Sequence, residues 1–163
     1  MGYGWCDMTD RTPDSQLQDQ TALRWNRLED EREACVVVSD RMELVYMNAA
    51  ARTLVPGEWF GKRCFEVLPT VDEACALHCP TIRAVNESVD VAYCEETLAG
   101  ENNLRRVFGV GLIPLGPGGG DRARAIFVLR ARGASVDEGA FRAQLLTDAR
   151  SLAQRTASRR SAP

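Results

Sequence analysis

The side chains of this sequence whose types and spacing could do chemistry are its cysteines. The chain has six cysteines and one histidine among its 163 residues. Thiolate sulfur and imidazole nitrogen are zinc ligands, and four cysteine thiolates can hold an iron–sulfur cluster. Five of these side chains lie in the middle of the chain: Cys64, Cys75, His78, Cys79 and Cys94. We therefore expect the four cysteines to form a cluster site, or three of them and His78 to form a zinc site.

Two other interpretations of the same cysteines remain open. A reversible disulfide or a thiol sensor requires an exposed thiolate with a partner nearby, and the sequence does not show proximity. Cysteine is also a small apolar side chain that packs well in a protein core. We expect that packing role for Cys35, which lies in an apolar run at residues 34–39.

Motifs of the common catalytic sites are absent from the sequence. It contains no Gly-x-Ser-x-Gly, no His-Glu-x-x-His and no Cys-x-x-Cys. The glycine-rich stretch at residues 116–120 lacks the Gly-Lys-Ser/Thr ending of a phosphate-binding loop. We therefore predict that the protein is not an enzyme.

Composition and charge favour a single globular domain. Of the residues, 45% are hydrophobic and 26% are charged, which is typical of such domains. The 20 basic and 23 acidic side chains leave a net charge of −3, so we expect no direct binding to nucleic acid. No apolar run reaches the roughly 18 residues of a membrane-spanning helix, and the N-terminus does not resemble a secretory signal. We therefore expect a cytoplasmic protein that does not contact the membrane.

Hydrophobic periodicity predicts an α+β domain between two terminal helices. We expect strands over residues 34–39, 43–48, 89–98, 104–115 and 123–131, and short helices over residues 49–54, 61–69 and 81–86. The expected organisation is a disordered tail at 1–13, an N-terminal flanking helix at 14–33, a domain at 34–132, and a C-terminal helix with a basic tail at 133–163. Ser135 and Glu138 have the spacing of a capping box at the start of the last helix.

The order of these elements resembles a PAS sensor domain. That family opens with an apolar strand, an acidic turn, a second apolar strand and an asparagine that starts a helix. Residues 35–51 resemble this opening, with Asp40 in the turn and Asn48 at the helix start. Residues 61–68 resemble the next short helix of the family, and residues 104–132 resemble its last two strands. The resemblance implies an α+β fold, a PAS-like five-stranded antiparallel sheet with short helices on one face and flanking helices at both ends.

PAS domains bind haem, flavin, small metabolites, metals or no ligand, between the sheet and the short helices. A pocket in this chain would be lined by six side chains: Tyr46, Trp59, Phe60, Phe65, Ile82 and Tyr93. The alternative is that they are ordinary core residues. His78 is the one candidate for a haem ligand, and the Asn-Cys-Arg-Phe-Leu-Gln motif of the flavin photosensors in this family is absent. The cofactor therefore stays open, with an iron–sulfur cluster or zinc ahead of haem, and we do not expect flavin.

The resemblance implies a sensory function, because PAS domains report a signal to another protein. We expect a module that responds to redox state, a metal or cofactor, or a small ligand, by a change in the segment from Cys64 to Ile82. Movement of the flanking helices would then signal to a separate kinase or transcription regulator, and we expect a homodimer. The alternatives are a thiol-redox or iron–sulfur electron-transfer protein, and a ligand-free dimerisation scaffold.

Overall fold

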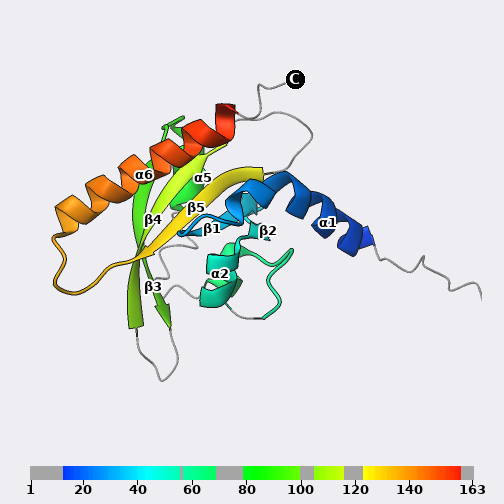
Figure 1. The fold of residues 1–163 in the computed structure, drawn as a ribbon, viewed down its shortest axis with the longest axis horizontal. Coiled ribbons are helices and arrows are strands. Elements are labelled where there is room, and N and C mark those ends of the chain that lie inside the picture. Colours follow the sequence, from blue (N-terminus) through cyan, green and yellow to red (C-terminus); the bar gives the residue numbers. More distant parts are fainter. Residues whose placement is uncertain (1–12, 56, 69–78, 100–104, 116–122, 159–163) are drawn as a thin grey trace, which may run out of the picture.

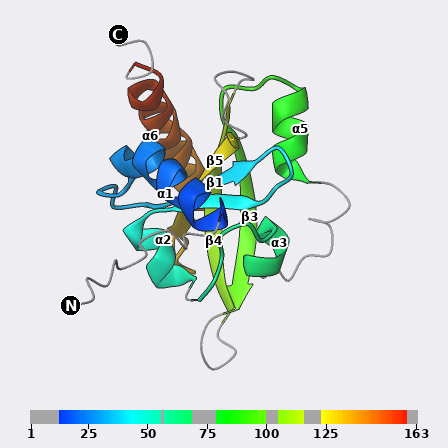
Figure 2. The same ribbon diagram turned by 90° about the vertical axis from the view of Figure 1, so that its right-hand side faces the viewer.

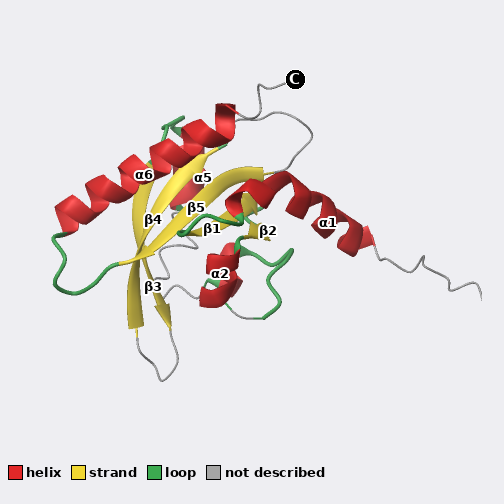
Figure 3. Cartoon of the chain, viewed as in Figure 1, coloured by secondary structure: helices red, strands yellow, loops and turns green. Residues whose placement is uncertain are grey.

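The structure is a computed structural model that describes residues 13–55, 57–68, 79–99, 105–115 and 123–158 (Figures 1 and 3). The helices are α1 Pro13–Trp25, the 3-10 helix η1 Asn26–Leu28, α2 Ala49–Leu54, α3 Cys64–Val67, α5 Pro80–Asn86 and α6 Glu138–Ser158. The strands are β1 Ala34–Ser39, β2 Leu44–Met47, β3 Ala92–Ala99, β4 Arg105–Pro114 and β5 Ala123–Ala131. Except for Pro13, the predicted tail at 1–13 lies outside the described residues, as do residues 159–163 of the predicted basic tail.

The strands form one antiparallel sheet in the order β2-β1-β5-β4-β3. The predicted five-stranded antiparallel sheet is therefore confirmed. The bounds predicted at residues 34–39 and 123–131 coincide with β1 and β5. All six residues of β1 are buried, because this strand lies between β2 and β5 and the sheet is covered on both faces. That double cover explains why its sequence is a continuous apolar run instead of an alternating one.

Successive residues of a strand point to opposite faces of a sheet, so each strand contributes to two cores. Val36 and Val38 belong to one core, whereas Cys35 and Val37 belong to the other. We call the face that carries Val36 the inner face and the face that carries Val37 the outer face. Different helices cover the two faces, and the candidate cysteines have to be placed on one face or the other.

Short helices cover the inner face. Ala51 of α2, Cys64 of α3 and Leu68 pack there against strand side chains such as Phe108 and Phe127. The helix α5 contacts β3, β4 and β5, with Thr81 and Ala84 buried. Figure 2 shows α3 and α5 on the side of the sheet away from α6. The short helices α2, α3 and α5 therefore lie on one face of the sheet, as predicted.

The long C-terminal helix covers the outer face. Phe141, Leu145, Ala149 and Leu152 of α6 recur every three or four residues, which places them on one side of the helix. All four are buried in the outer core. Trp25 at the end of α1 joins them, and the rest of α1 extends away from the sheet (Figure 1). Both predicted flanking helices are present, and within the described residues no helix is long and apolar enough to cross a membrane.

Two helix ends differ from the sequence expectation. The α-helix predicted over residues 14–33 ends at Trp25, and a 3-10 turn follows that buries Leu28 under the outer face. At the other end of the chain, α6 is capped by Asp137, whose Oδ2 accepts a hydrogen bond from the Ala140 amide at 3.0 Å. The helix begins at Glu138, so its cap is Asp137 and not the predicted Ser135, and aspartate is as good a cap as serine.

Candidate functional site

Two of the candidate cysteines lie in the inner-face core. Cys64 is the first residue of α3 and is buried, and Cys94 is half-buried on β3. Cys94 pairs in register with Val110, which is a member of the same core. The structure thus brings into one cluster two thiols that come from a helix and a strand, with the whole of α5 between them in the sequence.

Of the other three predicted metal ligands, the structure describes only Cys79. Cys79 is the N-cap residue of α5 and is half-buried. Cys75 and His78 lie outside the described residues. Among the residues that the structure describes, no three histidine, cysteine or acidic side chains are grouped as a metal site. The four-cysteine site and the Cys3His site therefore both stay predictions.

The predicted aromatic pocket is divided by the fold. Trp59 packs against the inner-face core, and its ring meets that of Phe60 edge-on, with the centroids 5.9 Å apart. Phe65 is 44% exposed and Ile82 is 51% exposed. Neither of them lines the inner core, because each lies on the outward side of its short helix. Arg63 instead covers the ring of Phe65, at 5.9 Å from the centroid.

Tyr46 and Tyr93 lie on the outer face, so the expectation of one pocket shared with Trp59 is wrong. The register shows the reason, because residues directly opposite in a sheet share a face. Tyr46 pairs with Val37, and Tyr93 pairs with Gly111, which faces α6. Both tyrosines pack in the outer core.

The hydroxyl groups of these two tyrosines are bound to carboxylates. Tyr46 donates to Glu29, and burial together with this carboxylate raises the pKa of Tyr46. Tyr93 donates to Glu95 at 3.0 Å, and burial followed by this bond raises the pKa of Tyr93 to about 12. Arg142 of α6 lies over the Tyr93 ring, 5.1 Å from its centroid. These contacts give both side chains a structural role on the outer face.

A charged cavity on the outer face was not predicted from the sequence. It has a volume of about 200 Å³ and lies between α6 and residues 29–33, which we call the connector. Its lining includes Glu31, Arg155, Ser151 and, from β1, Cys35. Burial and the nearby glutamates raise the pKa of the Cys35 thiol to about 12, so this thiol stays protonated. The signal available in the sequence was the density of acids in the connector, which reads Glu-Asp-Glu-Arg-Glu.

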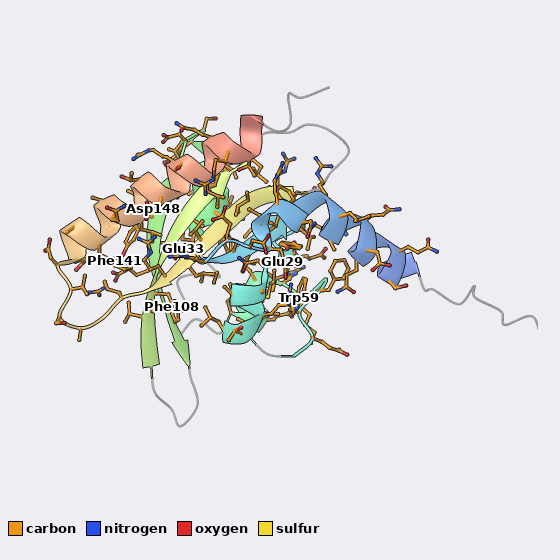
Figure 4. The ribbon with its side chains drawn as sticks, in the orientation of Figure 1. Glu29, Glu33, Trp59, Phe108, Phe141 and Asp148 are labelled. Carbon is orange, nitrogen blue, oxygen red and sulfur yellow. The ribbon has the colours of Figure 1, made fainter. Side chains whose placement is uncertain are left out.

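The connector glutamates reach several elements (Figure 4). Glu33 accepts from Arg130 Nε of β5 at 2.8 Å, and the same guanidinium reaches Asp148 of α6 at 2.6 Å. Hydrogen bonding to Arg130 lowers the pKa of Asp148. Glu29 pairs with Arg52 of α2, which lowers the pKa of Glu29. The connector therefore joins helices on both faces of the sheet.

An antiparallel five-stranded sheet with short helices on one face and a long flanking helix on the other is an α+β architecture. The sequence model of the PAS fold matches residues 28–136, which is more than half of the chain. The chain belongs to the PAS family, as the opening hairpin and the last strands indicated. PAS domains are sensor modules.

Solved structures of PAS and LOV proteins are similar to this chain. The Rhodobacter sphaeroides LOV protein has 17% identity and a TM-score of 0.57, over 86% of this chain and 94% of that chain. The PAS domain of a Colwellia psychrerythraea protein has 14% identity and a TM-score of 0.52, over 70% and 98%. A Vibrio cholerae VqmA dimer, described with LuxR-type receptors, has 15% identity and a TM-score of 0.52, over 68% and 51%. These identities show the fold alone, and no curated protein matches the sequence.

Proposed function

We propose that this PAS module senses its signal through the cysteines of the inner face and reports it to a separate signalling protein through the flanking helices. The observation that carries the proposal is the shared cluster of Cys64 and Cys94. A change at these sulfurs, by oxidation or by metal binding, would alter the packing of the inner-face core to which both side chains belong. Interiors are close-packed, so such a change is transmitted to neighbouring elements instead of being absorbed.

The segment between α3 and α5 supports the same input. Cys64 is the first residue of α3 and Cys79 is the N-cap residue of α5, so each of these two thiols lies at the N-terminus of a short helix. Cys75 and His78 lie between them in the sequence. Soft thiolate ligands suit zinc or an iron–sulfur cluster. Where no metal binds, two thiols can give up two electrons and two protons to an oxidant such as peroxide and form a disulfide.

The proposed output lies at the flanking helices. Leu17 is 55% exposed and Leu23 is 79% exposed on α1, where the helix extends beyond the sheet. Contact with another helix would remove the apolar surface of these two leucines from water. We infer a homodimer, with a kinase or a transcription regulator as the downstream partner.

The proposed role of the cysteines is tested on anaerobically purified protein. Its metal content, its acid-labile sulfide and its visible absorption spectrum are measured. Iron and sulfide in equal amounts with a broad visible band would identify a cluster, and zinc alone would identify a zinc site. For a metal-free protein, the thiols are titrated and hydrogen exchange is measured before and after treatment with diamide. We expect Cys64→Ser to remove the bound metal or the effect of the oxidant.

Cys35→Ser is the matched control, because Cys35 is also buried but lies on the outer face. It should leave metal content and oxidant response as in the parent protein. A metal-free protein whose hydrogen exchange is unchanged by diamide would overturn the cysteine input. In that case a small ligand or a ligand-free scaffold would remain as the function of the module.

A further inference from the structure

The connector contacts the inner-face helices through its first glutamate. It has no regular secondary structure and links η1 to β1. Arg52 of α2 donates to Glu29, with Nη1 3.3 Å from Oε2 and a second contact through Nη2. The hydroxyl of Tyr46 donates to the same carboxylate. A displacement of α2 therefore changes the position of Glu29.

Of the other two connector glutamates, Glu31 binds the outer-face helix directly and Glu33 reaches it through Arg130. Arg155 of α6 donates to Glu31 at 3.1 Å. Glu33 is bound to Arg130, which also binds Asp148 of α6. The pairs are partly exposed, with side-chain exposures between 23% and 54%. Each is therefore weak by itself, and together they form a network between the connector and one side of α6.

The backbone of the connector is held by one buried side chain. The amide of Asn48 donates to the carbonyl oxygens of Leu28, Glu31 and Glu33 at 3.0, 3.3 and 2.8 Å. Asn48 is also the N-cap of α2. The two ends of the connector thus move together with the start of α2, whereas the charged cavity between the connector and α6 leaves room for a relative shift.

We propose that the connector couples the inner-face helices to α6 around the edge of the sheet, as a relay from Arg52 through Glu29, Glu31 and Glu33 to Arg155 and Asp148. The sheet stands between α2 and α6, and the connector forms side-chain ion pairs with both helices, through Glu29 with Arg52 and through Glu31 with Arg155. The relay deepens the proposed function by giving its route from the inner face to a flanking helix. It rests on that function for its input, but the coupling itself is measured without any ligand.

Hydrogen exchange on the full chain tests the relay. Arg52→Gln removes the guanidinium from α2, and Arg52 lies on the face opposite α6. We expect amide exchange at residues 148–156 to become about two- to fivefold faster, the change that corresponds to loss of a partly exposed ion pair. Glu29→Gln should give the same increase. The double variant should exchange no faster than either single variant, because both changes break the same link.

Two control variants isolate the route. Arg83→Gln breaks the exposed pair between Arg83 and Glu87 within α5, which does not involve the connector. It should leave the exchange of residues 148–156 unchanged. Arg150→Gln breaks the pair with Asp90 at 3.1 Å and should loosen α6 while leaving the amides of α2 unchanged.

The results also separate the relay from the cysteine input. Unchanged exchange of α6 in Arg52→Gln, or an equal increase in Arg83→Gln, would overturn the relay. If Arg52→Gln speeds exchange in α6 but neither metal nor oxidant has any effect, the relay stands and the cysteine input fails. If oxidation or metal alters α6 equally in the parent and in Arg52→Gln, the input stands and the relay is overturned.

Discussion

At the residue scale, Asn48 holds more of the backbone together than its short side chain suggests. It is completely buried, and its Oδ1 accepts from the amides of Cys35 and Ala51 at 2.9 and 3.0 Å. Its Nδ2 faces only carbonyl oxygens, so the orientation of the amide is fixed by its partners. One side chain therefore ties the connector to β1 and to the first turn of α2.

Replacing Asn48 by aspartate should destabilise the protein strongly. The carboxylate keeps the oxygen that caps α2, but it puts a second oxygen against the carbonyls of Leu28, Glu31 and Glu33. Buried polar groups left unsatisfied cost about 1–3 kcal/mol each, so we expect the free energy of unfolding to fall by about 3 kcal/mol. Urea denaturation measures this change. Asn86→Asp, at an exposed position, should stay within about 0.5 kcal/mol of the parent.

The sequence predicted some of these residue roles and not others. It identified Asn48 as the start of a helix, but its three carbonyl partners precede β1 and no local pattern connects them. Likewise, alternation along a strand shows that Tyr46 and Met47 point in different directions. It does not show which direction is inner, because β1 is apolar on both faces. The placement of Tyr46 and Tyr93 therefore required the strand register.

At the element scale, two glycines of β4 set how closely α6 approaches the sheet. A Cβ at Gly109 would lie 2.4 Å from Cε1 of Phe141, and a Cβ at Gly111 would lie 3.1 Å from the Cβ of Ala149. Neither glycine has a positive φ, so both are required for space and not for backbone conformation. Because neither residue has a side chain, the apolar side of α6 packs closely against the backbone of β4.

Gly109→Ala should therefore displace α6. The ring of Phe141 is buried and has to move to admit the new methyl group, and overpacking of this kind typically costs about 1–3 kcal/mol. We expect a loss in this range in urea denaturation. Phe141→Ala should lower the free energy of unfolding less in the Gly109→Ala variant than in the parent protein, because removing the ring also removes the clash. Gly133→Ala is the control, because its Cβ would meet only Val136, at 3.4 Å.

Elements were predicted better than their ends and their partners. The strands and the short helices follow from β-branched runs, turn residues and Pro80, which are local signals. The end of α1 at Trp25 does not, because it depends on the burial of Trp25 and Leu28 against β-strands far away in the sequence. The alternation of Val107, Gly109 and Gly111 with larger residues showed two faces in β4, but not that the glycine face receives α6.

At the scale of the whole molecule, the two cores lie on opposite faces of one sheet. Carboxylate–arginine ion pairs lie beside each core and join neighbouring elements. Glu29 pairs with Arg52 beside the inner-face helices, and Asp148 pairs with Arg130 beside the outer-face helix. In both carboxyl groups, hydrogen bonding to the arginine outweighs desolvation and lowers the pKa. The folded state therefore binds protons more weakly than the unfolded chain does at these two positions, and acid should weaken the link between the layers.

The free energy of unfolding should be nearly constant at neutral pH and decrease in acid. The contribution of each pair is complete above the unfolded pKa values of 4.5 for Glu29 and 3.8 for Asp148, and it is lost as the pH falls through the lower folded values. Because both pairs are partly exposed, we expect about 0.2–1 kcal/mol from each. Urea denaturation between pH 7 and pH 3 measures the slope, which should be shallower in the double variant Glu29→Gln, Asp148→Asn. An equally steep decrease in that variant would show that other carboxylates cause the acid sensitivity.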